Sequence, residues 1–472
     1  MCIMAGKKRN VYMKITSFNK YIFPVFMFVV FGYSIRVHAQ AITTIANVDN
    51  RWGFDGDGNS AAFAKFDGPR GIAVDAQGNI YIADASNNRI RKIDLFQNVT
   101  TIAGTGKAGY GGDGGLATKA ELNFPTFILL DDSGNLYISD TYNYRVRKIN
   151  TSGVITTIAG NGKQGIRAIG DSGLATVAEF DLPPYGLAFD NDSNLYICTA
   201  IRVRKVNKAG IISTVAGVGQ TGYGGDGGPA VKAAFGQIMS AAFDKYGNMF
   251  LADMKYHTIR KVDPAGTITR YAGTVNIIPT SPNTGDGGPA INAKIVAATD
   301  MKFDKRGNLY FTDQSDGRIR MIDSEGIIST FAGNGKSVHS GDGGPAIQAG
   351  IHSPYAMTID NDGNFFFTET SEHNTEVSND VRYIFAGVDP NALPIELYPN
   401  PTFNGVFKIR FASAYEENVT VQIVNAQGVT VYKNSIPTNR GVNIRIDPIG
   451  IYFITAKSLH GKWRDKVSVV HE

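Results

Sequence analysis

The sequence predicts an all-β protein, in which a closed ring of six four-stranded sheets is followed by a small Ig-like antiparallel β-sandwich. Three observations lead to this prediction: a phrase that recurs at near-constant intervals, four strand patterns in each repeat, and one strand pattern left over at the front. Hydrophobic residues make up 43% of the 472 residues and charged residues 19%, which excludes disorder throughout the chain. Together these features predict a six-bladed β-propeller.

The repeat is marked by the phrase Ile-Thr-Thr-Ile-Ala-Gly and its variants, which recur at intervals of 54 to 60 residues. Six units of this design fill residues 41–387. The alanine of the phrase stands at Ala46, Ala103, Ala159, Ala216, Ala272, Ala332 and Ala386. Short β-branched and aromatic runs between Gly, Asp and Asn turns indicate strands and hairpins within each unit.

The first complete unit shows the four strands of a blade in order. We expect strand a at Gly71–Asp75, strand b at Ile80–Asp84, strand c at Arg89–Asp94 and strand d at Val99–Ala103. An Asp-x-x-Gly-Asn turn joins strands a and b, and a Gly-Asp-Gly-Gly loop leads from strand d to the next blade. This order predicts a four-stranded antiparallel sheet in every unit.

The two ends of the repeat region predict that the ring closes. A lone segment of strand-d type, Ile42–Ala46, precedes the first complete unit. The last unit has patterns for strands a, b and c, at Tyr355–Asp360, Asn364–Glu369 and Val381–Ala386, but none for strand d. We therefore expect Ile42–Ala46 to complete the last sheet, which removes two exposed edges.

Several motifs carry a resemblance to a known family. The segments Pro-x-Gly-Ile-Ala-Val-Asp at 69–75, Gly-Asn-Ile-Tyr-Ile-Ala-Asp at 78–84 and Gly-Asp-Gly-Gly-Pro-Ala at 225–230 resemble the NHL-repeat β-propellers. The form is that of secreted bacterial proteins and is similar to the teneurin propeller. The resemblance covers about three quarters of the chain and implies a six-bladed fold, but no single activity.

Residues 1–39 are predicted to be a secretory signal peptide, with Lys14 and Lys20 before an apolar stretch and small residues before a cleavage point after Ala39. A membrane anchor is the alternative, but the apolar stretch is short and contains Pro24. We therefore predict no transmembrane span in the mature chain. Whether Met1 or Met13 is the start stays open. Residues 1–40 hold six cations and no acid, so the formal charge of +4 becomes 4 − 6 = −2 without them, and nucleic acid is not expected as a partner.

The pattern changes after a predicted linker at 388–394. Residues 395–472 contain alternating strands over a short length, which predicts a small antiparallel sandwich. The segment resembles the type A C-terminal sorting domain of the type IX secretion system, at Leu397–Pro401, Gly405 and Gly450–Phe453. The resemblance implies that the type IX secretion machinery recognises the tail, and that the propeller is secreted or displayed on the outer-membrane surface. A generic adhesive sandwich is the alternative.

Residues that repeat in every blade are expected to be architectural. Arg-x-Arg pairs such as Arg89/Arg91 share one strand face and are predicted to reach strand-end acids such as Asp84, Asp140 and Asp313, with a basic ligand face as the alternative. The loop aspartates are interpreted as turn formers, since no phosphate-loop lysine accompanies them and each loop offers calcium one carboxylate. Cys198 stands at a small-residue position of strand b and is expected to be buried.

Candidate ligand-binding residues lie where the blades differ, near the start of strand a. Asp67, Asn123, Asp181 and His352 are polar members of one repeat position on consecutive blades. One step nearer to the strand, a second varying repeat position holds Arg70, Tyr185 and Tyr355, and Asp300 is also unmatched. These eight residues are predicted to ring the channel mouth, and the alternative is that they cap turns.

We therefore expect a noncatalytic surface module that binds an extracellular glycan or protein. The alternative is a metal-dependent propeller enzyme, either a gluconolactonase-like hydrolase or a lyase. Zinc enzymes need about three protein ligands, usually rich in histidine. The propeller histidines His257, His339, His352 and His373 occupy unlike repeat positions, so no catalytic residue, metal or cofactor is predicted.

Overall fold

The computed structural model describes residues 42–165, 170–275, 285–371 and 378–385 of the ring. In the tail it describes 392–398, 406–413, 418–425, 429–437, 442–446, 450–457 and 462–469. The predicted signal peptide, 1–39, lies outside these residues, as does His373.

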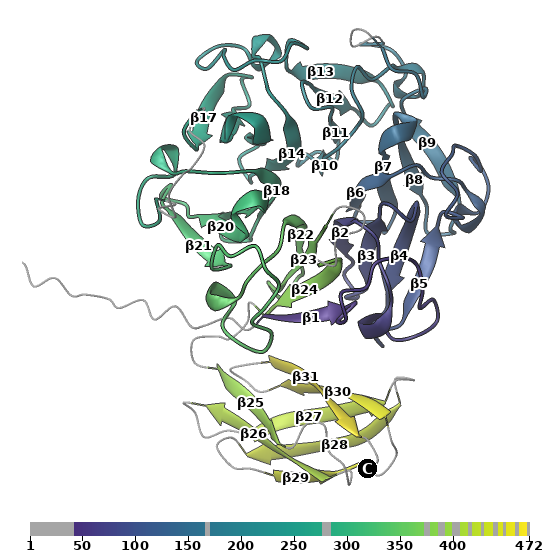
Figure 1. The fold of residues 1–472 in the computed structure, drawn as a ribbon, viewed down its shortest axis with the longest axis vertical. Helices are drawn as coiled ribbons and strands as arrows, with labels where there is room; N and C mark the ends of the chain where they lie inside the picture. Colours follow the sequence, from purple (N-terminus) through teal and green to yellow (C-terminus); the bar gives the residue numbers. More distant parts are fainter. Residues whose placement is uncertain are drawn as a thin grey trace, which may run out of the picture. The chain divides into compact units, whose positions relative to one another are not determined.

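Six four-stranded antiparallel sheets form the ring, as predicted (Figure 1). Blade 1 contains β2 (Pro69–Val74), β3 (Ile80–Asp84), β4 (Arg89–Ile93) and β5 (Val99–Ala103). Blade 2 contains β6 (Pro125–Leu130), β7 (Leu136–Asp140), β8 (Arg145–Ile149) and β9 (Ile155–Ala159). Blade 3 contains β10 (Leu187–Phe189), β11 (Leu195–Cys198), β12 (Val203–Val206) and β13 (Ile212–Ala216).

The second half of the ring repeats this order. Blade 4 contains β14 (Ile238–Phe243), β15 (Met249–Asp253), β16 (Thr258–Val262) and β17 (Ile268–Ala272). Blade 5 contains β18 (Ala298–Phe303), β19 (Leu309–Asp313), β20 (Arg318–Ile322) and β21 (Ile328–Ala332). Blade 6 contains β22 (Pro354–Ile359), β23 (Phe365–Glu369), β24 (Asp380–Ile384) and β1 (Ile42–Ala46).

The helices of the described residues are single 3-10 turns. Six follow the loops that enter a blade: η1 (Ala61–Phe63), η2 (Ala117–Lys119), η4 (Ala175–Val177), η5 (Ala230–Lys232), η7 (Ala290–Asn292) and η9 (Ala346–Gln348). Three join strands b and c: η3 (Thr141–Asn143), η6 (Met254–Tyr256) and η8 (Gln314–Asp316). None of these described turns has the length and apolarity of a membrane span.

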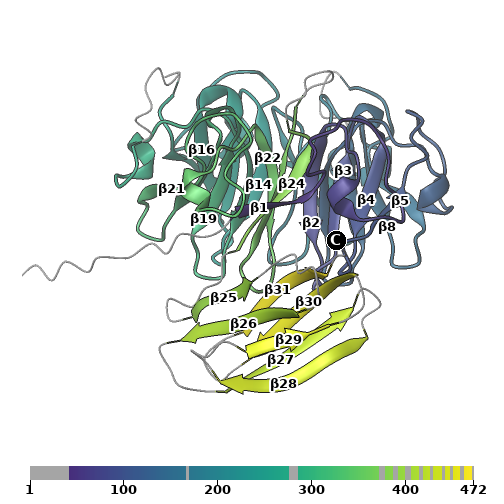
Figure 2. The same ribbon diagram turned by 60° about the horizontal axis from the view of Figure 1, so that its bottom comes forward.

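The ring closes as the sequence predicts. Strand β1 pairs antiparallel with β24, with Ile42 opposite Ile384, and both views of the ring show the two strands side by side (Figures 1 and 2). The carbonyl of Ile42 also accepts a hydrogen bond from the Gly343 amide at 2.8 Å. The first described strand therefore completes the sheet that the last blade begins.

Buried arginines hold each blade to the loop that enters it. Arg91, Arg147, Arg204, Arg260, Arg320 and Arg382 are among the largest fully buried side chains of the described chain. Arg147, for example, lies 3.4 Å from the strand-end carboxylate of Asp140 and 2.7 Å from the loop carboxylate of Asp113. This confirms structural ion pairing for the arginines.

The prediction that the loop aspartates act as turn formers is corrected by the structure, because they also form ion pairs. Their carboxylates lie 2.5 to 2.9 Å from the buried arginines and so neutralise them. The six pairs are Arg91–Asp57, Arg147–Asp113, Arg204–Asp171, Arg260–Asp226, Arg320–Asp286 and Arg382–Asp342. The arginine and the aspartate of each pair stand far apart in the sequence, so the loop motif alone predicts only a local turn.

The described strands of the tail form two antiparallel sheets. One has the order β25 (Ala392–Tyr398), β26 (Val406–Ser413) and β29 (Val442–Arg445). The other has the order β28 (Thr430–Pro437), β27 (Asn418–Asn425), β30 (Gly450–Lys457) and β31 (Lys462–Val469). Strand β25 begins at Ala392, within the segment 388–394 that the sequence predicts as a linker.

Candidate functional site

Four planar side chains from three blades form a continuous stack where the inner strands begin. Tyr142 of η3 stacks on Phe124, with ring centroids 4.8 Å apart and planes 11° from parallel. The guanidinium carbon of Arg70 lies 4.8 Å from the centroid of Phe124 and 4.6 Å from that of Tyr355. The stack leads from Tyr142, which is 54% exposed, to Tyr355, which is 2% exposed.

Arg70 is held in the stack by Tyr355, and one of its donors has no partner in the described chain. Its Nη1 donates a hydrogen bond to the Tyr355 hydroxyl at 3.0 Å. Its Nε is buried and makes no hydrogen bond to the described chain. A guanidinium has five N–H donors in a planar fork, which suits carboxylate and hydroxyl acceptors.

Phe124 adopts a backbone conformation that is unusual for a bulky residue. Its φ is +55°, whereas the same repeat position is Gly68 in blade 1, with φ of +59°. A side chain in this left-handed region costs about 1–2 kcal/mol. The Phe124 amide is fixed by the Asn88 side chain at 2.8 Å, and the strained residue supplies the ring on which both Tyr142 and Arg70 lie.

Tyr185 of blade 3 lies beside this stack. Burial raises the pKa of its hydroxyl, and Tyr355, Tyr142 and Arg70 are close enough to influence its charge. Beneath it, Phe127, Met239 and Tyr355 belong to one buried apolar cluster that joins several blades. We call Arg70, Phe124, Tyr142, Tyr185 and Tyr355 the mouth cluster, which therefore stands on an apolar floor.

The predicted polar arc is not gathered in this way. The backbone amides of Asp67 and Asn123 donate to the strand-end carboxylates of Asp84 and Asp140, each at 2.8 Å. The amides of Gly236 and Val296 make the same contact in blades 4 and 5. Because these contacts are made by the backbone, the repeat tolerates different side chains at this position.

The other two members of the arc bind locally. Asp181 forms an ion pair with Arg202 and accepts a hydrogen bond from Thr199 at 3.1 Å. This blade lacks the strand-end aspartate, and Thr199 follows the buried Cys198 where the other blades have an acid. His352 contacts Ser337, its Nδ1 lying 3.1 Å from the serine hydroxyl.

Asp300 lies inside the wall of the ring. It is 2% exposed, and its carboxylate lies 2.7 Å from Lys302. It also accepts a hydrogen bond at 3.0 Å from the Met357 amide of the next blade. Asp300 therefore ties two inner strands together, and Arg70, Tyr185 and Tyr355 are the predicted residues that the structure brings to one place.

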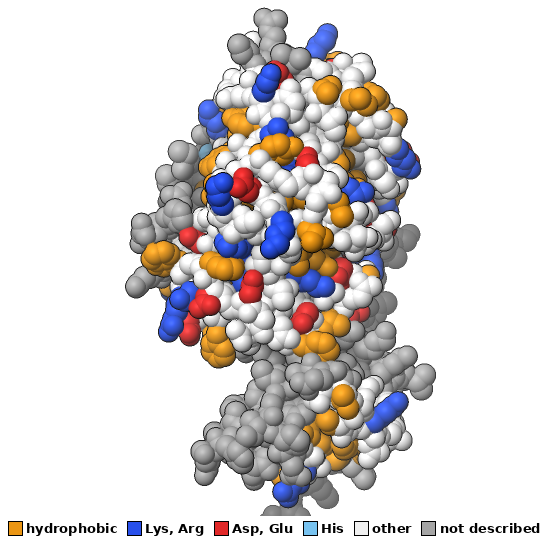
Figure 3. All heavy atoms as spheres, turned by 90° about the vertical axis from the view of Figure 1, so that its right-hand side faces the viewer, with side chains coloured by type: hydrophobic (Ala, Val, Ile, Leu, Met, Phe, Trp, Pro, Cys, Tyr) orange, Lys and Arg blue, Asp and Glu red, His pale blue; other side chains and the backbone are white. Residues whose placement is uncertain are grey.

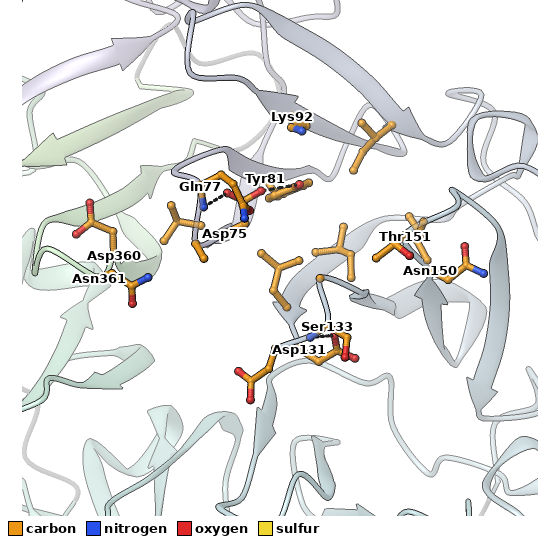
Figure 4. Close-up of a pocket in the computed structure, with 18 of the residues that line it drawn as sticks. Asp75, Gln77, Tyr81, Lys92, Asp131, Ser133, Asn150, Thr151, Asp360 and Asn361 are labelled. Carbon is orange, nitrogen blue, oxygen red and sulfur yellow. Dashed lines mark hydrogen bonds between the residues drawn. The ribbon is translucent and has the colours of Figure 1, made fainter. Parts of the chain in front are cut away.

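Away from the mouth cluster, a hollow of about 680 Å³ is lined by turns that join strands a and b in blades 6, 1 and 2 (Figure 4). Asp75 accepts hydrogen bonds there from the Gln77 amide at 3.0 Å and from the Tyr81 hydroxyl at 3.1 Å. Asp131 and Asp360 occupy the same turn position in their blades. Most polar groups of this hollow recur from blade to blade as part of the repeat, whereas those of the mouth cluster occur once.

Phe124 and Tyr142 were missed by the sequence reasoning. The available signal was a phenylalanine at a position that is glycine in blade 1, in a blade whose turn between strands b and c carries Tyr142. The contact of Phe124 with Arg70 joins two neighbouring blades, so no motif within one repeat shows it.

Comparison with known proteins agrees with the architecture. Residues 396–470 match the family model of the secretion system C-terminal sorting domain, and residues 66–93 match that of the NHL repeat. Teneurin-1 of Gallus gallus is 29% identical over 288 residues, which cover 53% of this chain and 10% of the relative. NHL repeat-containing protein 2 of Gallus gallus is 24% identical over 343 residues, which cover 66% of this chain and 46% of the relative.

A crystal structure of a protein of unknown function from Bacteroides thetaiotaomicron shares the fold, with a TM-score of 0.54 and 19% identity over 73% of this chain and 76% of that chain. The chain spans about a tenth of the length of the teneurins it matches. The sorting domain marks the protein for secretion to the cell surface or the outside of the cell. The chain is thus a six-bladed β-propeller that matches the NHL repeat at 66–93, followed by a secretion system C-terminal sorting domain at 396–470.

Proposed function

We propose that the propeller is a noncatalytic module that binds an extracellular glycan at the mouth cluster after export. The observation that carries this proposal is the stack of Tyr142, Phe124, Arg70 and Tyr355, which joins an exposed aromatic face to a guanidinium. Tyrosine offers both an apolar face and a polar tip, a combination common at binding surfaces. The apolar face of one sugar ring would lie on Tyr142, and the hydroxyl or carboxylate groups of another sugar residue of the same glycan would accept from Arg70.

The surface charge favours a ligand of this kind over a polyanion such as nucleic acid. On the face of the propeller drawn in Figure 3, acidic and basic side chains are interspersed. A nucleic-acid footprint would instead gather lysine and arginine on one face. Binding is therefore expected to depend on a few aromatic and hydrogen-bonding contacts and only weakly on salt.

The alternative, a metal-dependent hydrolase or lyase, needs metal ligands next to the bound substrate. Within the described ranges, histidine and carboxylate ligand atoms come together in one group of three residues, in blade 6, and none of its members belongs to the mouth cluster. The mouth cluster offers aromatic rings and a guanidinium, which bind and orient but do not by themselves supply a general base.

The proposal is tested with a glycan array probed with the mature chain, followed by calorimetry on the glycans that bind. Tyr142→Ala and Arg70→Ala are each expected to weaken binding at least about tenfold, or about 1.4 kcal/mol. Tyr246→Ala is the matched control, because Tyr246 is a 72% exposed tyrosine in a turn between strands a and b of blade 4. Equal binding by all three variants, or cleavage of the bound glycan, would reject the proposal.

A further inference from the structure

Blade 6 departs from the repeat at three positions that meet in space. His339 stands three residues before the loop aspartate, where Phe54, Tyr110 and Tyr223 stand in other blades. Glu369 ends strand b, where the equivalent residues are Asp84, Asp140, Asp253 and Asp313. Asp380 begins strand c, where the equivalent residues are Arg89, Arg145, Thr258 and Arg318.

The standard arrangement is an arginine under an aromatic ring. In blade 2 the guanidinium carbon of Arg145 lies 3.6 Å from the centroid of Tyr110, and in blade 1 that of Arg89 lies 3.7 Å from the centroid of Phe54. Blade 6 replaces the ring with an imidazole and the cation with a carboxylate. Because three residues that meet at one place all differ from the repeat, we infer that this place has a different chemical role. Neutral variation at a single position would not explain all three changes.

The three side chains place their ligand atoms close together. His339 Nδ1 lies 3.0 Å from Glu369 Oε2 and 3.0 Å from Asp380 Oδ2. Both carboxylates are fully buried, and the histidine side chain is 19% exposed. Ligand atoms that share one metal at bonds of about 2.1 Å stand about 3.0–3.4 Å apart, so these separations suit a metal.

The imidazole is oriented by the strand that closes the ring. His339 Nε2 lies 3.2 Å from the Thr44 hydroxyl oxygen. The Thr44 backbone amide donates to the Asp342 carboxylate at 2.9 Å, and the lone pairs of the Thr44 hydroxyl can accept from Nε2–H. With its proton on Nε2, the ring turns Nδ1 toward two carboxylates, and the place between these three atoms suits either a proton on Nδ1 or a metal ion. A metal-bound histidine usually donates its other N–H to such an acceptor.

Apart from the His339 ring nitrogen, 3.0 Å from its Oδ2, Asp380 lacks the partners that a buried carboxylate requires. Both of its oxygens are buried and make no other hydrogen bond to the described residues. The nearby guanidinium of Arg382 is engaged elsewhere, 3.0 Å from Glu369 and 2.7 Å from Asp342. Three carboxylates, Glu369, Asp380 and Asp342, stand against one guanidinium and one imidazole. They leave two negative charges when the imidazole is neutral and one when it is protonated, so an excess of negative charge remains in either state, which is costly without a counter-ion.

We propose that His339 Nδ1, Glu369 Oε2 and Asp380 Oδ2 bind a divalent transition metal, with zinc as the first candidate. One imidazole and two carboxylates are ligands that zinc accepts, and a water molecule would complete its tetrahedron. The two positive charges would balance the excess at this place. The metal would join the loop after β21 to strands β23 and β24, in the blade that β1 completes. This site is separate from the mouth cluster and does not depend on the proposed function.

The sequence alone predicts no metal in this protein, and the site in blade 6 differs from that prediction. That expectation rested on histidines at unlike repeat positions, but a single histidine suffices when two carboxylates from other strands meet it. The spacing of His339, Glu369 and Asp380 along the chain gives no motif, and the antiparallel pairing of β23 with β24, which sets Glu369 opposite Asp380, brings them together.

The test measures metal binding by the mature full-length chain. After treatment with a chelator, titration calorimetry with zinc chloride is expected to give one site per chain, and elemental analysis of the dialysed protein one zinc per chain. Asp380→Asn is expected to weaken the affinity at least about 100-fold. His352→Ala is the matched control, since it removes a propeller histidine outside the group.

A triple variant, His339→Tyr with Glu369→Asp and Asp380→Arg, installs the residues that blade 2 uses at Tyr110, Asp140 and Arg145. It is expected to fold, because the repeat already contains this arrangement, and to bind no zinc. Zinc should raise the Tm of the unmodified chain by several degrees and leave that of the triple variant unchanged. Absence of stoichiometric zinc or manganese in the unmodified chain, or equal binding by the triple variant, would overturn the proposal.

Discussion

At the scale of single residues, the propeller depends on buried arginines that contact one acidic side chain at a strand end and another in the entering loop. Arg147 contacts Asp140 at the end of its own sheet and Asp113 in the entering loop, and it also donates to the carbonyls of Glu121 and Gly111. Such a cation is stable only while its partners remain. Burial disfavours the charged form of the strand-end acid. It therefore raises the pKa of Asp140 to about 6, despite the hydrogen bonds that this carboxylate accepts.

This pKa predicts how the stability of one variant depends on pH. Because the folded value lies above the ordinary value of 3.8, the folded chain holds a proton that the unfolded chain has released. The contribution of Asp140 to stability is therefore present below about pH 4 and is lost as the pH rises through about 6. Asp140→Asn should destabilise the protein more at pH 4 than at pH 7, by up to about 3 kcal/mol, since one pKa unit corresponds to about 1.4 kcal/mol.

Urea unfolding of the two proteins at several pH values measures this difference. Other buried acids such as Asp84 and Asp313 contribute equally to both proteins, so the comparison isolates Asp140. The exposed Asp132 of the same blade provides a control, Asp132→Asn. A destabilisation that stays constant or grows between pH 4 and pH 7 would contradict the assignment.

At the scale of strands, the inner strands approach one another more closely than side chains normally allow. Gly71 on β2 faces the backbone of β6, and a Cβ there would lie 2.7 Å from the Ile128 nitrogen and 2.8 Å from the Phe127 Cα. Gly186 faces the backbone of blade 4 in the same way. The glycines therefore set the distance between neighbouring blades near the mouth cluster.

Gly71→Ala is accordingly expected to lower stability by about 1–3 kcal/mol, because two backbone segments would have to separate. Gly224→Ala is the matched control, since its Cβ would meet nothing within 4 Å. Thermal unfolding should show a lower Tm for the first variant and an unchanged or slightly higher Tm for the second. Equal Tm values for the two variants would show that the blades yield easily at β2.

The strands were largely predictable from the sequence, and the site was only partly so. Strands b and d of blade 1 begin and end where their patterns predict, at Ile80–Asp84 and Val99–Ala103, because alternation and turn residues are local signals. Asp67 and Asn123 differ in identity at one repeat position, yet the contacts that recur there are made by their backbone amides and carbonyls. Phe124 looked ordinary, and its importance depends on Arg70 of a neighbouring blade.

At the scale of the whole molecule, stability depends on the sheet that both ends of the ring share. Ile42 is fully buried in a core with Ile319, Phe367 and Ile384, which come from blades 5 and 6. Thr43, the next residue, is exposed on the same strand. The closing strand thus contributes a buried face as well as backbone hydrogen bonds.

Ile42→Asp should therefore destabilise the propeller by about 3 kcal/mol or more, because a carboxylate would enter an apolar core. Thr43→Asp introduces the same charge on the exposed face and is expected to change the free energy of unfolding by less than about 0.5 kcal/mol. Urea unfolding of both variants distinguishes the two cases. Similar losses for both would mean that β1 is held by its backbone alone.

The pairing of Ile42 with Ile384 also has a consequence for biogenesis. A ribosome or a translocon delivers β1 before any other strand of the propeller and β24 after all the rest, so the first strand must wait for a partner until the propeller has been made. Blades 1 to 5 can assemble from neighbouring segments as they emerge, whereas the sixth cannot. The ring is therefore latched only after the last strand of the propeller has been synthesised.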